Sequence, residues 1–298
     1  MTPGEPIHAE LIAVVVAVTD AQPRVLTLLD GSALPAGPLE SGHRSLQAGL
    51  RHWVERHTGH RLGHIEQLYT FADPDRSRAG RSISICYLAL ANETRTPLGG
   101  RVSWQDWYRF FPWEDRRVAH TIIETIVKPG LSHWSAGNPE RLTRAARLFG
   151  LDGEDWQEDR ALARYELLYE AGLVREATRD GRPAHGEFVP GATLAADHRR
   201  ILATAISRLR ARIGYRPVVF ELMAEQFTLL DLQRCIEALT GQTLHKANFR
   251  RLIESQTLLE DSGNFSSGSG RPAKLYRFRA EVLAERAEAG TRLPLARP

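Results

Sequence analysis

Cysteine is scarce in this chain, with 2 residues in a length of 298. Cys86 and Cys235 each lie inside an apolar run, and their spacing matches neither a disulfide framework nor a zinc site. We therefore expect two buried free thiols in a reducing compartment, and no metal site.

The chain also lacks a hydrophobic run long enough for a membrane span. The apolar run Leu11–Val18 is too short to cross a bilayer, and no basic segment of the kind that opens a signal peptide precedes it. Charged residues make up 25% and hydrophobic residues 42% of the chain, which are ordinary values for a soluble globular protein. We expect a cytoplasmic protein with room for about two domains.

Lysine is rare, so arginine carries almost all of the positive charge; the only lysines are Lys128, Lys246 and Lys274. The net charge of +3 is too mild to imply a nucleic-acid partner by itself. The distribution of charge along the chain matters more than its sum.

Apolar and β-branched runs predict strands in the first third of the chain, at residues 9–18, 25–29, 64–71 and 82–91. Residues 34–42 form a loop rich in proline and glycine. Apolar side chains then recur at helical spacing from Leu46 to Val54, which predicts an amphipathic helix over residues 45–58 that ends at Gly59.

The middle of the chain is predicted to be mainly helical, over residues 114–128, 138–149 and 154–176, with a loop at 178–191. Just before it, the aromatic stretch at residues 104–113 indicates a packed edge or a domain contact more than a cofactor site. A strongly amphipathic helix follows from Asp197 to Arg212, with Ile201, Ala205 and Leu209 on one face and Arg199, Arg208 and Arg212 on the others.

Residues 34–59, LPAGPLESGHRSLQAGLRHWVERHTG, have the layout of a Nudix box without its carboxylates. That motif presents several glutamates from one helix face to Mg²⁺, because hard divalent cations prefer carboxylate oxygens. Trp53, Arg56 and His57 occupy the metal-binding glutamate positions here, and Glu55 is out of register. We expect no catalytic residue and no metal at this helix.

The same helix carries positive charge that suits a phosphate group. Arg44, Arg51 and Arg56 lie where a pyrophosphate would rest in an active relative, and a planar guanidinium can hold two phosphate oxygens at once. The alternative for each is an ordinary solvated arginine. The pattern predicts a domain that binds a nucleotide and leaves it intact.

Residues 228–255 have the pattern of a helix-turn-helix. A helix from Thr228 to Leu239 is followed by a tight turn at Gly241 and a second helix from about Thr243 to Ser255. A short strand is predicted just before, at residues 217–223. The alternative is a structural helical hairpin with a solvated basic face. The second helix would enter the major groove of DNA and offers these candidate contacts: Thr243, Lys246, Asn248, Arg250 and Arg251.

A β-wing is predicted after the second helix, over residues 256–279, as strand, Gly/Ser-rich loop and strand. Ser267, Arg271 and Lys274 suit contacts with phosphate or the minor groove. From Gly241 to Arg279 there are seven Lys/Arg against three Asp/Glu, which is the local excess expected of a DNA-binding surface.

Together these segments resemble the Nudix-related transcriptional regulators of NAD metabolism, in particular the longer NadQ-type regulators, which are related to the NrtR type. The most specific part runs from YRPVVFELM through FTLLDLQRCIEALTGQTLHKANFRRLIE to the wing GRPAKLYRF. The resemblance implies an α+β fold in which a Nudix-like α/β/α sandwich with a helical insertion precedes a C-terminal winged helix-turn-helix. The implied divisions are 1–113 for the sensor, 114–190 for the insertion, 191–214 for the last sensor helix and linker, and 215–298 for the winged helix.

The resemblance also implies the function. We expect a dimeric repressor of NAD biosynthesis genes that binds operator DNA, requires no cofactor, and responds to an adenine nucleotide, NAD or ATP, as its effector. Tyr69 on a strand, with Arg78 and Arg81 in the loop after it, completes the candidate effector site. The alternative for Tyr69 is that it packs in the core. The alternative for Arg78 and Arg81 is that they belong to a polar loop without a ligand.

Two other functions compete with the repressor. An active Nudix hydrolase of ADP-ribose-type nucleotides would need clustered carboxylates, and the box offers only Glu40 and Glu55. A non-enzymatic adaptor whose winged helix binds protein would lack the steep salt dependence that comes from neutralising DNA phosphates.

Overall fold

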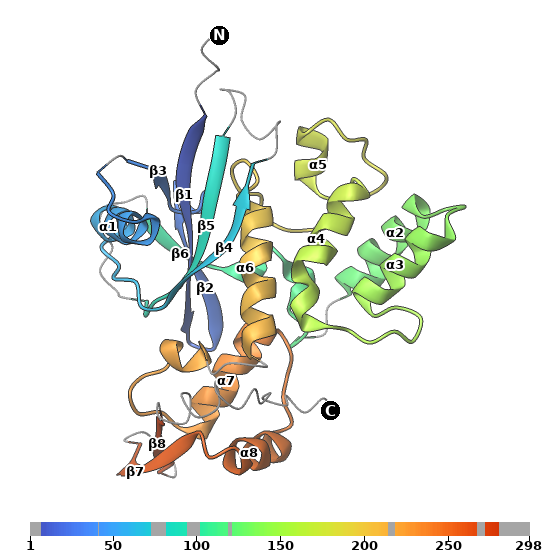
Figure 1. Ribbon diagram of the computed structural model, residues 1–298. Coiled ribbons are helices and arrows are strands. Elements are labelled where there is room, and N and C mark those ends of the chain that lie inside the picture. The colour runs from blue at the N-terminus through green and yellow to red at the C-terminus, as the bar shows by residue number, and fades with distance from the viewer. Residues whose placement is uncertain are drawn as a thin grey trace.

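Strand β1, His8–Thr19, is the centre of a mixed sheet (Figure 1). The computed structural model describes residues 7–40, 42–72, 82–93, 102–118, 121–213, 218–266 and 272–279. β1 pairs in parallel with β5 and antiparallel with β2 and the short β3. The sheet order is β4-β5-β1-β2-β6, with these bounds: β2 Gln22–Leu28, β3 Ala36–Pro38, β4 Ile65–Phe71, β5 Ser82–Leu90 and β6 Val102–Asp106.

The two faces of the sheet belong to different hydrophobic clusters, because alternate residues of a strand point to opposite sides. On β1, Leu11, Ala13 and Val15 pack in the cluster beneath helix α1, Leu46–Thr58. Ile12, Val14 and Val16 pack in the cluster that includes α6, His198–Ile213. The predicted α/β/α sandwich is confirmed, and the continuous apolar run of β1 is explained by burial on both faces.

A group of short helices lies beside α6 and forms the outer layer on that side (Figure 1). It begins with two 3₁₀ turns, η1 Trp107–Arg109 and η2 Pro112–Glu114, and a π-helical turn, Ile123–Val127, that runs into α2. The helices are α2 Lys128–Trp134, α3 Pro139–Phe149, the 3₁₀ turn η4 Glu158–Arg160, α4 Ala161–Glu170 and α5 Arg175–Arg179. The helical content predicted for this region is confirmed, although the helices are shorter than the sequence pattern indicates.

The C-terminal module contains helices α7, Leu229–Thr240, and α8, Lys246–Ser255, and the hairpin of β7, Leu259–Phe265, with β8, Lys274–Phe278. The predicted short strand at residues 217–223 is wrong: Val218–Leu222 is a 3₁₀ turn, η5. Its buried residues are Val218, Val219 and Leu222, which is helical spacing rather than the alternation of a strand.

One continuous hydrophobic cluster joins the α6 face of the sheet, the helical layer and the C-terminal module. The aromatic segment predicted to be a packed contact lies at its centre, and Trp107, Phe110, Phe111 and Trp113 are all buried. The two thiols, Cys86 and Cys235, are buried and free, and burial raises the pKa of Cys235 to about 12. Within the described ranges, no helix is long and apolar enough to cross a membrane.

Candidate functional site

Helix α1 is held in place by its caps and by its buried face. Ser45 caps the N-terminus, accepting a hydrogen bond from the backbone N–H of Ala48 at 3.2 Å, and Gly59 ends the helix in the left-handed conformation. Gly37 of β3 lies directly beneath the Trp53 indole, and a Cβ there would overlap the ring. These contacts fix the position of α1 on the sheet, and with it the helix on which the sequence analysis placed the ligand-binding arginines.

The three arginines assigned to this helix have different surroundings. Arg44 precedes the N-cap and is exposed, so it lies just outside the helix on which the sequence analysis placed it. Arg51 is half-buried and donates to the carbonyls of Leu62 and Gly63, the latter at 2.8 Å, which ties α1 to the segment before β4. Arg56 is exposed on α1. Arg56 and Arg44 therefore have their guanidinium groups open to solvent, while that of Arg51 is occupied.

The side chains at the metal-binding positions of the motif cannot bind magnesium in the usual way, since they offer no carboxylate oxygen. Trp53 stacks on His57 with ring centroids 4.2 Å apart, and Arg56 is positively charged. In the described segments there is no cluster of His, Cys, Asp and Glu suited to a metal ion. Glu55 is an exposed carboxylate on this helix with no ion pair to any described residue, and Glu40 interacts with His43 at 3.6 Å.

Tyr69 does not join the α1 arginines through any contact recorded among the described residues. Its side chain is 61% exposed, and its ring meets the ring of Phe71 edge to face at 5.1 Å. Phe71 belongs to the α6-side cluster, and Arg200 of α6 lies over it. Arg78 and Arg81 lie outside the described residues, so their roles stay predictions.

Helix α8 presents a basic surface on an apolar support. Phe249 and Ile253 are buried beneath it, whereas Lys246, Arg250 and Arg251 are exposed. Asn248 is half-buried and accepts a hydrogen bond from Arg251 at 3.3 Å. The helix starts later than predicted, so Thr243 is exposed in the turn before α8.

The hairpin beside α8 is anchored to the rest of the module. Phe227 and Tyr276 exchange backbone hydrogen bonds of 3.1 and 2.8 Å, and Phe220 of η5 stacks on Phe278 at 4.1 Å. Lys274 is exposed and pairs with Asp261 across the hairpin at 2.9 Å, and this hydrogen bond raises the pKa of Lys274. Ser267 and Arg271 lie outside the described residues.

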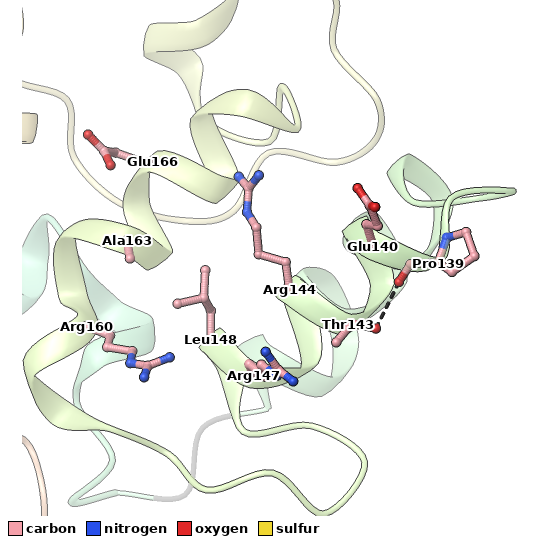
Figure 2. Close-up of a pocket in the computed structure, with 9 residues that line it drawn as sticks. All are labelled: Pro139, Glu140, Thr143, Arg144, Arg147, Leu148, Arg160, Ala163 and Glu166. Atoms are coloured by element: carbon pink, nitrogen blue, oxygen red, sulfur yellow. Dashed lines mark hydrogen bonds between the residues drawn. The ribbon is translucent and has the colours of Figure 1, made fainter.

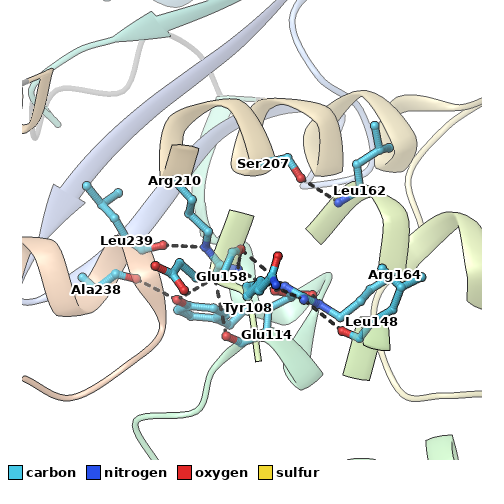
Figure 3. A network of polar contacts seen from close by, with 11 residues as sticks. Tyr108, Glu114, Leu148, Glu158, Leu162, Arg164, Ser207, Arg210, Ala238 and Leu239 are labelled. Carbon is cyan, nitrogen blue, oxygen red and sulfur yellow. Dashed lines mark hydrogen bonds and ion pairs between the residues drawn. The ribbon is translucent and has the colours of Figure 1, made fainter. Parts of the chain in front are cut away.

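A buried ion cluster joins the C-terminal module to the rest of the molecule, and the sequence analysis missed it (Figure 3). Glu114 receives a two-pronged interaction from Arg164 of α4, at 2.6 and 2.8 Å, and a third contact from Arg210 of α6, at 2.5 Å. All three side chains are at most 1% exposed. Burial pushes the pKa of Glu114 upward, but the charges and hydrogen bonds of the two arginines outweigh it and hold the pKa below its usual value.

The same cluster caps the C-terminus of α7. Arg210 donates to the carbonyl of Leu239 at 2.9 Å, and the Tyr108 hydroxyl donates to that of Ala238 at 2.7 Å. The last carbonyls of a helix have no partner within the helix and carry partial negative charge, so a guanidinium there is favourable. The backbone N–H of Arg116 also donates to Gly241 O at 2.7 Å. These contacts connect the helix-turn-helix directly to the segment 108–116.

The end of α6 is held from a second side, because Arg212 pairs with Glu66 of β4. At its beginning, Arg199 is buried and pairs with Glu176 at 3.0 Å, although the sequence placed Arg199 on a non-apolar face. Arg199 and Arg210 are eleven positions apart, about three helical turns, so they share one side of α6. This spacing could have indicated that both arginines lie on a buried side of α6. The apolar residues on the same helix made the arginines look like part of its exposed face.

Comparison with known proteins gives matches for the whole fold and for the C-terminal module. Residues 219–278 match the NrtR DNA-binding winged helix domain. A segment of 85 residues is 36% identical to a protein of Acinetobacter baylyi described as an ADPR-responsive transcriptional repressor, and it spans 28% of this chain and 34% of that relative's length.

Two solved structures share the fold over nearly the full length. NrtR of Shewanella oneidensis, solved in complex with a 27mer DNA, is 21% identical with a TM-score of 0.56, and the match covers 93% of this chain and 95% of that one. A MutT/nudix family protein of Enterococcus faecalis is 18% identical with a TM-score of 0.56 over 93% and 90% of the two chains. The resemblance to the Nudix-related regulators is thereby confirmed at the level of the fold, which is a Nudix-like domain followed by a winged helix, and residues 219–278 match the NrtR-type winged helix domain.

Proposed function

We propose that this protein is a transcriptional repressor whose winged helix binds operator DNA and whose Nudix-like domain binds an effector without hydrolysing it. The observation that carries the proposal is the exposed basic face of α8, with Lys246, Arg250 and Arg251 standing on the buried Phe249 and Ile253. Arginine can contact both acceptors of guanine in the major groove, and lysine neutralises phosphate. The winged helix match and the repressor description of the Acinetobacter relative support the same function.

The effector we propose is an adenine nucleotide that carries a diphosphate, NAD or ATP. The Acinetobacter relative is described as responsive to ADPR, whose adenosine diphosphate part is also contained in NAD. Arg44 and Arg56 are exposed beside and on α1, where each guanidinium is open to a phosphate group. Because the helix offers no carboxylate cluster, the bound nucleotide would remain intact, with no cofactor required.

Coupling between effector and DNA would pass through α6. Its C-terminal end is fixed to the sheet by Arg212 and Glu66 and to α7 by Arg210, so a shift of the sheet would be passed through α6 to the helix-turn-helix. The effector and the operator must then change each other's affinity by the same factor. We propose a homodimer on a two-fold symmetric operator upstream of NAD biosynthesis genes, since a repressor dimer matches the symmetry of such a site.

The DNA-binding part is tested with duplexes selected by the full chain from a random library. Arg250→Ala or Arg251→Ala should weaken binding to the selected duplex by roughly 1–3 kcal/mol if the residue contacts a base. Lys274→Ala should weaken selected and unselected duplexes about equally, because a phosphate contact carries no sequence information. Arg208→Ala, an exposed arginine on α6, is the matched control and should bind like the wild type. If both α8 variants retain wild-type affinity in fluorescence anisotropy, α8 does not read DNA.

The effector is tested by thermal stabilisation against NAD, ATP, ADP-ribose and AMP, with and without Mg²⁺, followed by operator binding at fixed salt. A true effector raises the melting temperature by mass action without Mg²⁺ and changes operator affinity. A nucleotide that binds tightly yet leaves operator affinity unchanged would contradict the proposed coupling. Mg²⁺-dependent release of AMP that is lost in Glu55→Gln would support the hydrolase instead.

A further inference from the structure

An open groove lies between helices α3 and α4, and none of its lining residues belongs to the proposed effector or DNA site (Figure 2). Its volume is about 710 Å³, which is within the range of sites for small ligands. Leu148 and Ala163 form its apolar part, and Arg144, Arg147 and Arg160 supply three guanidinium groups from two elements. This combination of arginines and apolar side chains suits a small molecule with one negatively charged end and one apolar part.

The arginines of the groove differ in how firmly they are engaged. Arg144 pairs with Glu170 at one edge, and Arg147 lies 4.0 Å from Glu154, at the limit of an ion pair, with its side chain 63% exposed. Arg160 is half-buried on η4, and among the residues that the structure describes it has no ion-pair partner. In Figure 2 its side chain extends toward α3. A half-buried guanidinium without a carboxylate leaves donors available for an anion.

The carboxylates of the groove limit what can bind. Glu166 is occupied by Arg200 of α6, at 2.9 Å, while Glu140 lies in the first turn of α3, away from η4. The Thr143 hydroxyl donates to the carbonyl of Pro139 at 2.9 Å and is not a free donor. With Glu166 held by Arg200 and Arg147 only loosely engaged by Glu154 at 4.0 Å, Arg160 is a lining cation without an ion pair among the described residues. Glu140 at the other end disfavours a long acidic chain.

We propose that this groove is a second anion site, which binds a small phosphorylated molecule with its phosphate between Arg147 and Arg160. A phosphate group fits because two guanidinium groups can share its oxygens in charge-assisted hydrogen bonds. The apolar patch at Leu148 and Ala163 accepts the uncharged part of the ligand. The site is separate from α1 and does not depend on the effector proposed there.

The location of the groove also links it to the buried ion cluster. Arg160 and Glu158 belong to the same 3₁₀ turn, and the backbone carbonyl of Glu158 accepts hydrogen bonds from Arg210 at 3.0 Å and Arg164 at 3.4 Å. The backbone N–H of Leu162, at the start of α4, donates a hydrogen bond to the hydroxyl oxygen of Ser207 on α6 at 2.8 Å. A ligand bound by Arg160 would therefore contact η4, the turn whose Glu158 carbonyl is hydrogen-bonded to the buried ion cluster.

The test is isothermal titration of the full chain with pyrophosphate and with AMP. Both probes should bind saturably to the wild type, and Arg147→Gln with Arg160→Gln should weaken the binding by roughly tenfold or more, since charge-assisted hydrogen bonds are lost. Arg208→Gln removes an exposed charge outside the groove and should leave binding unchanged. Ala163→Glu adds a carboxylate to the apolar patch and should abolish binding, which keeps the test valid if the double variant is unstable.

The outcomes that overturn the proposal are distinct from those that concern α1. Binding that survives in both groove variants, or binding that is lost in Arg56→Gln and not in the groove variants, places the anion elsewhere. No saturable binding of either probe to the wild type, or binding only of an acidic peptide, also overturns it. If the groove variants bind the probes like the wild type and nucleotides still change their operator affinity, the groove proposal is refuted but the proposed function is not.

Discussion

Substitution of Glu114 by glutamine should reveal how strongly the C-terminal module is attached. The change keeps an acceptor oxygen and nearly the same volume, but it leaves Arg164 and Arg210 as two uncompensated charges with at most 1% exposure. Removing one partner of a buried ion pair typically costs about 3–5 kcal/mol. For a chain of this size each kcal/mol corresponds to roughly 2–4 °C, so the melting temperature should fall by about 6–20 °C.

The assay is urea unfolding followed by tryptophan fluorescence, with Glu140→Gln as the matched control. Glu140 is exposed on α3, and its substitution should change stability by less than about 0.5 kcal/mol. Because Arg210 also caps α7, the Glu114 variant should unfold its C-terminal module at lower urea than the sheet, which would separate one transition into two. If Glu114→Gln unfolds within about 1 kcal/mol of the wild type and in a single transition, the cluster does not hold the module in place.

Three further predictions follow from described contacts. The pKa of Glu114 in the folded protein lies below its usual value of 4.5, so the carboxylate contributes its full stabilisation above pH 4.5 and loses it as the pH falls through the folded pKa. The free energy of unfolding, measured in urea between about pH 6 and pH 3, should therefore decrease in the wild type by an amount that is missing in Glu114→Gln. Gly37→Ala would push a methyl group into the Trp53 indole, and denaturation should show a loss of about 1–3 kcal/mol, accompanied by a change in tryptophan fluorescence; an unchanged stability would mean that Trp53 moves freely. Thr228→Ala removes the capping box formed with Asp231 and should cost about 0.5–2 kcal/mol, with reduced amide protection confined to the start of α7.

The elements that the sequence predicted well are those whose pattern is local. The strand β1, the end of α1 at Gly59 and the start of α7 at Thr228 depend on a few neighbouring residues, so periodicity and cap preferences sufficed. The strand predicted at residues 217–223 was wrong because a short apolar run does not distinguish a strand from a helical turn. The partners that bury Val218 and Val219 come from distant segments.

The functional surfaces were only partly accessible from sequence. The basic residues of α8 could be found because the helix carries its buried and exposed positions at a regular spacing. Glu114, Arg164 and Arg210 could not be grouped, since they are separated by 50 and 96 positions along the chain and nothing local marks a charge as buried. Tyr69 was assigned to the effector site from its place on a strand, and its role there stays a prediction; the register of β4 against β5 shifts between Gln67 and Thr70, and the Tyr69 side chain is exposed.

The separation of the two sheet faces has a consequence for how such a protein could diverge from an enzyme. Leu11, Ala13 and Val15 serve α1, whereas Ile12, Val14 and Val16 serve the side on which the C-terminal module is built. Substitutions on α1 would therefore disturb only the first of these layers. The chemistry of α1 could change in a lineage while the layer that carries the C-terminal module stayed unchanged.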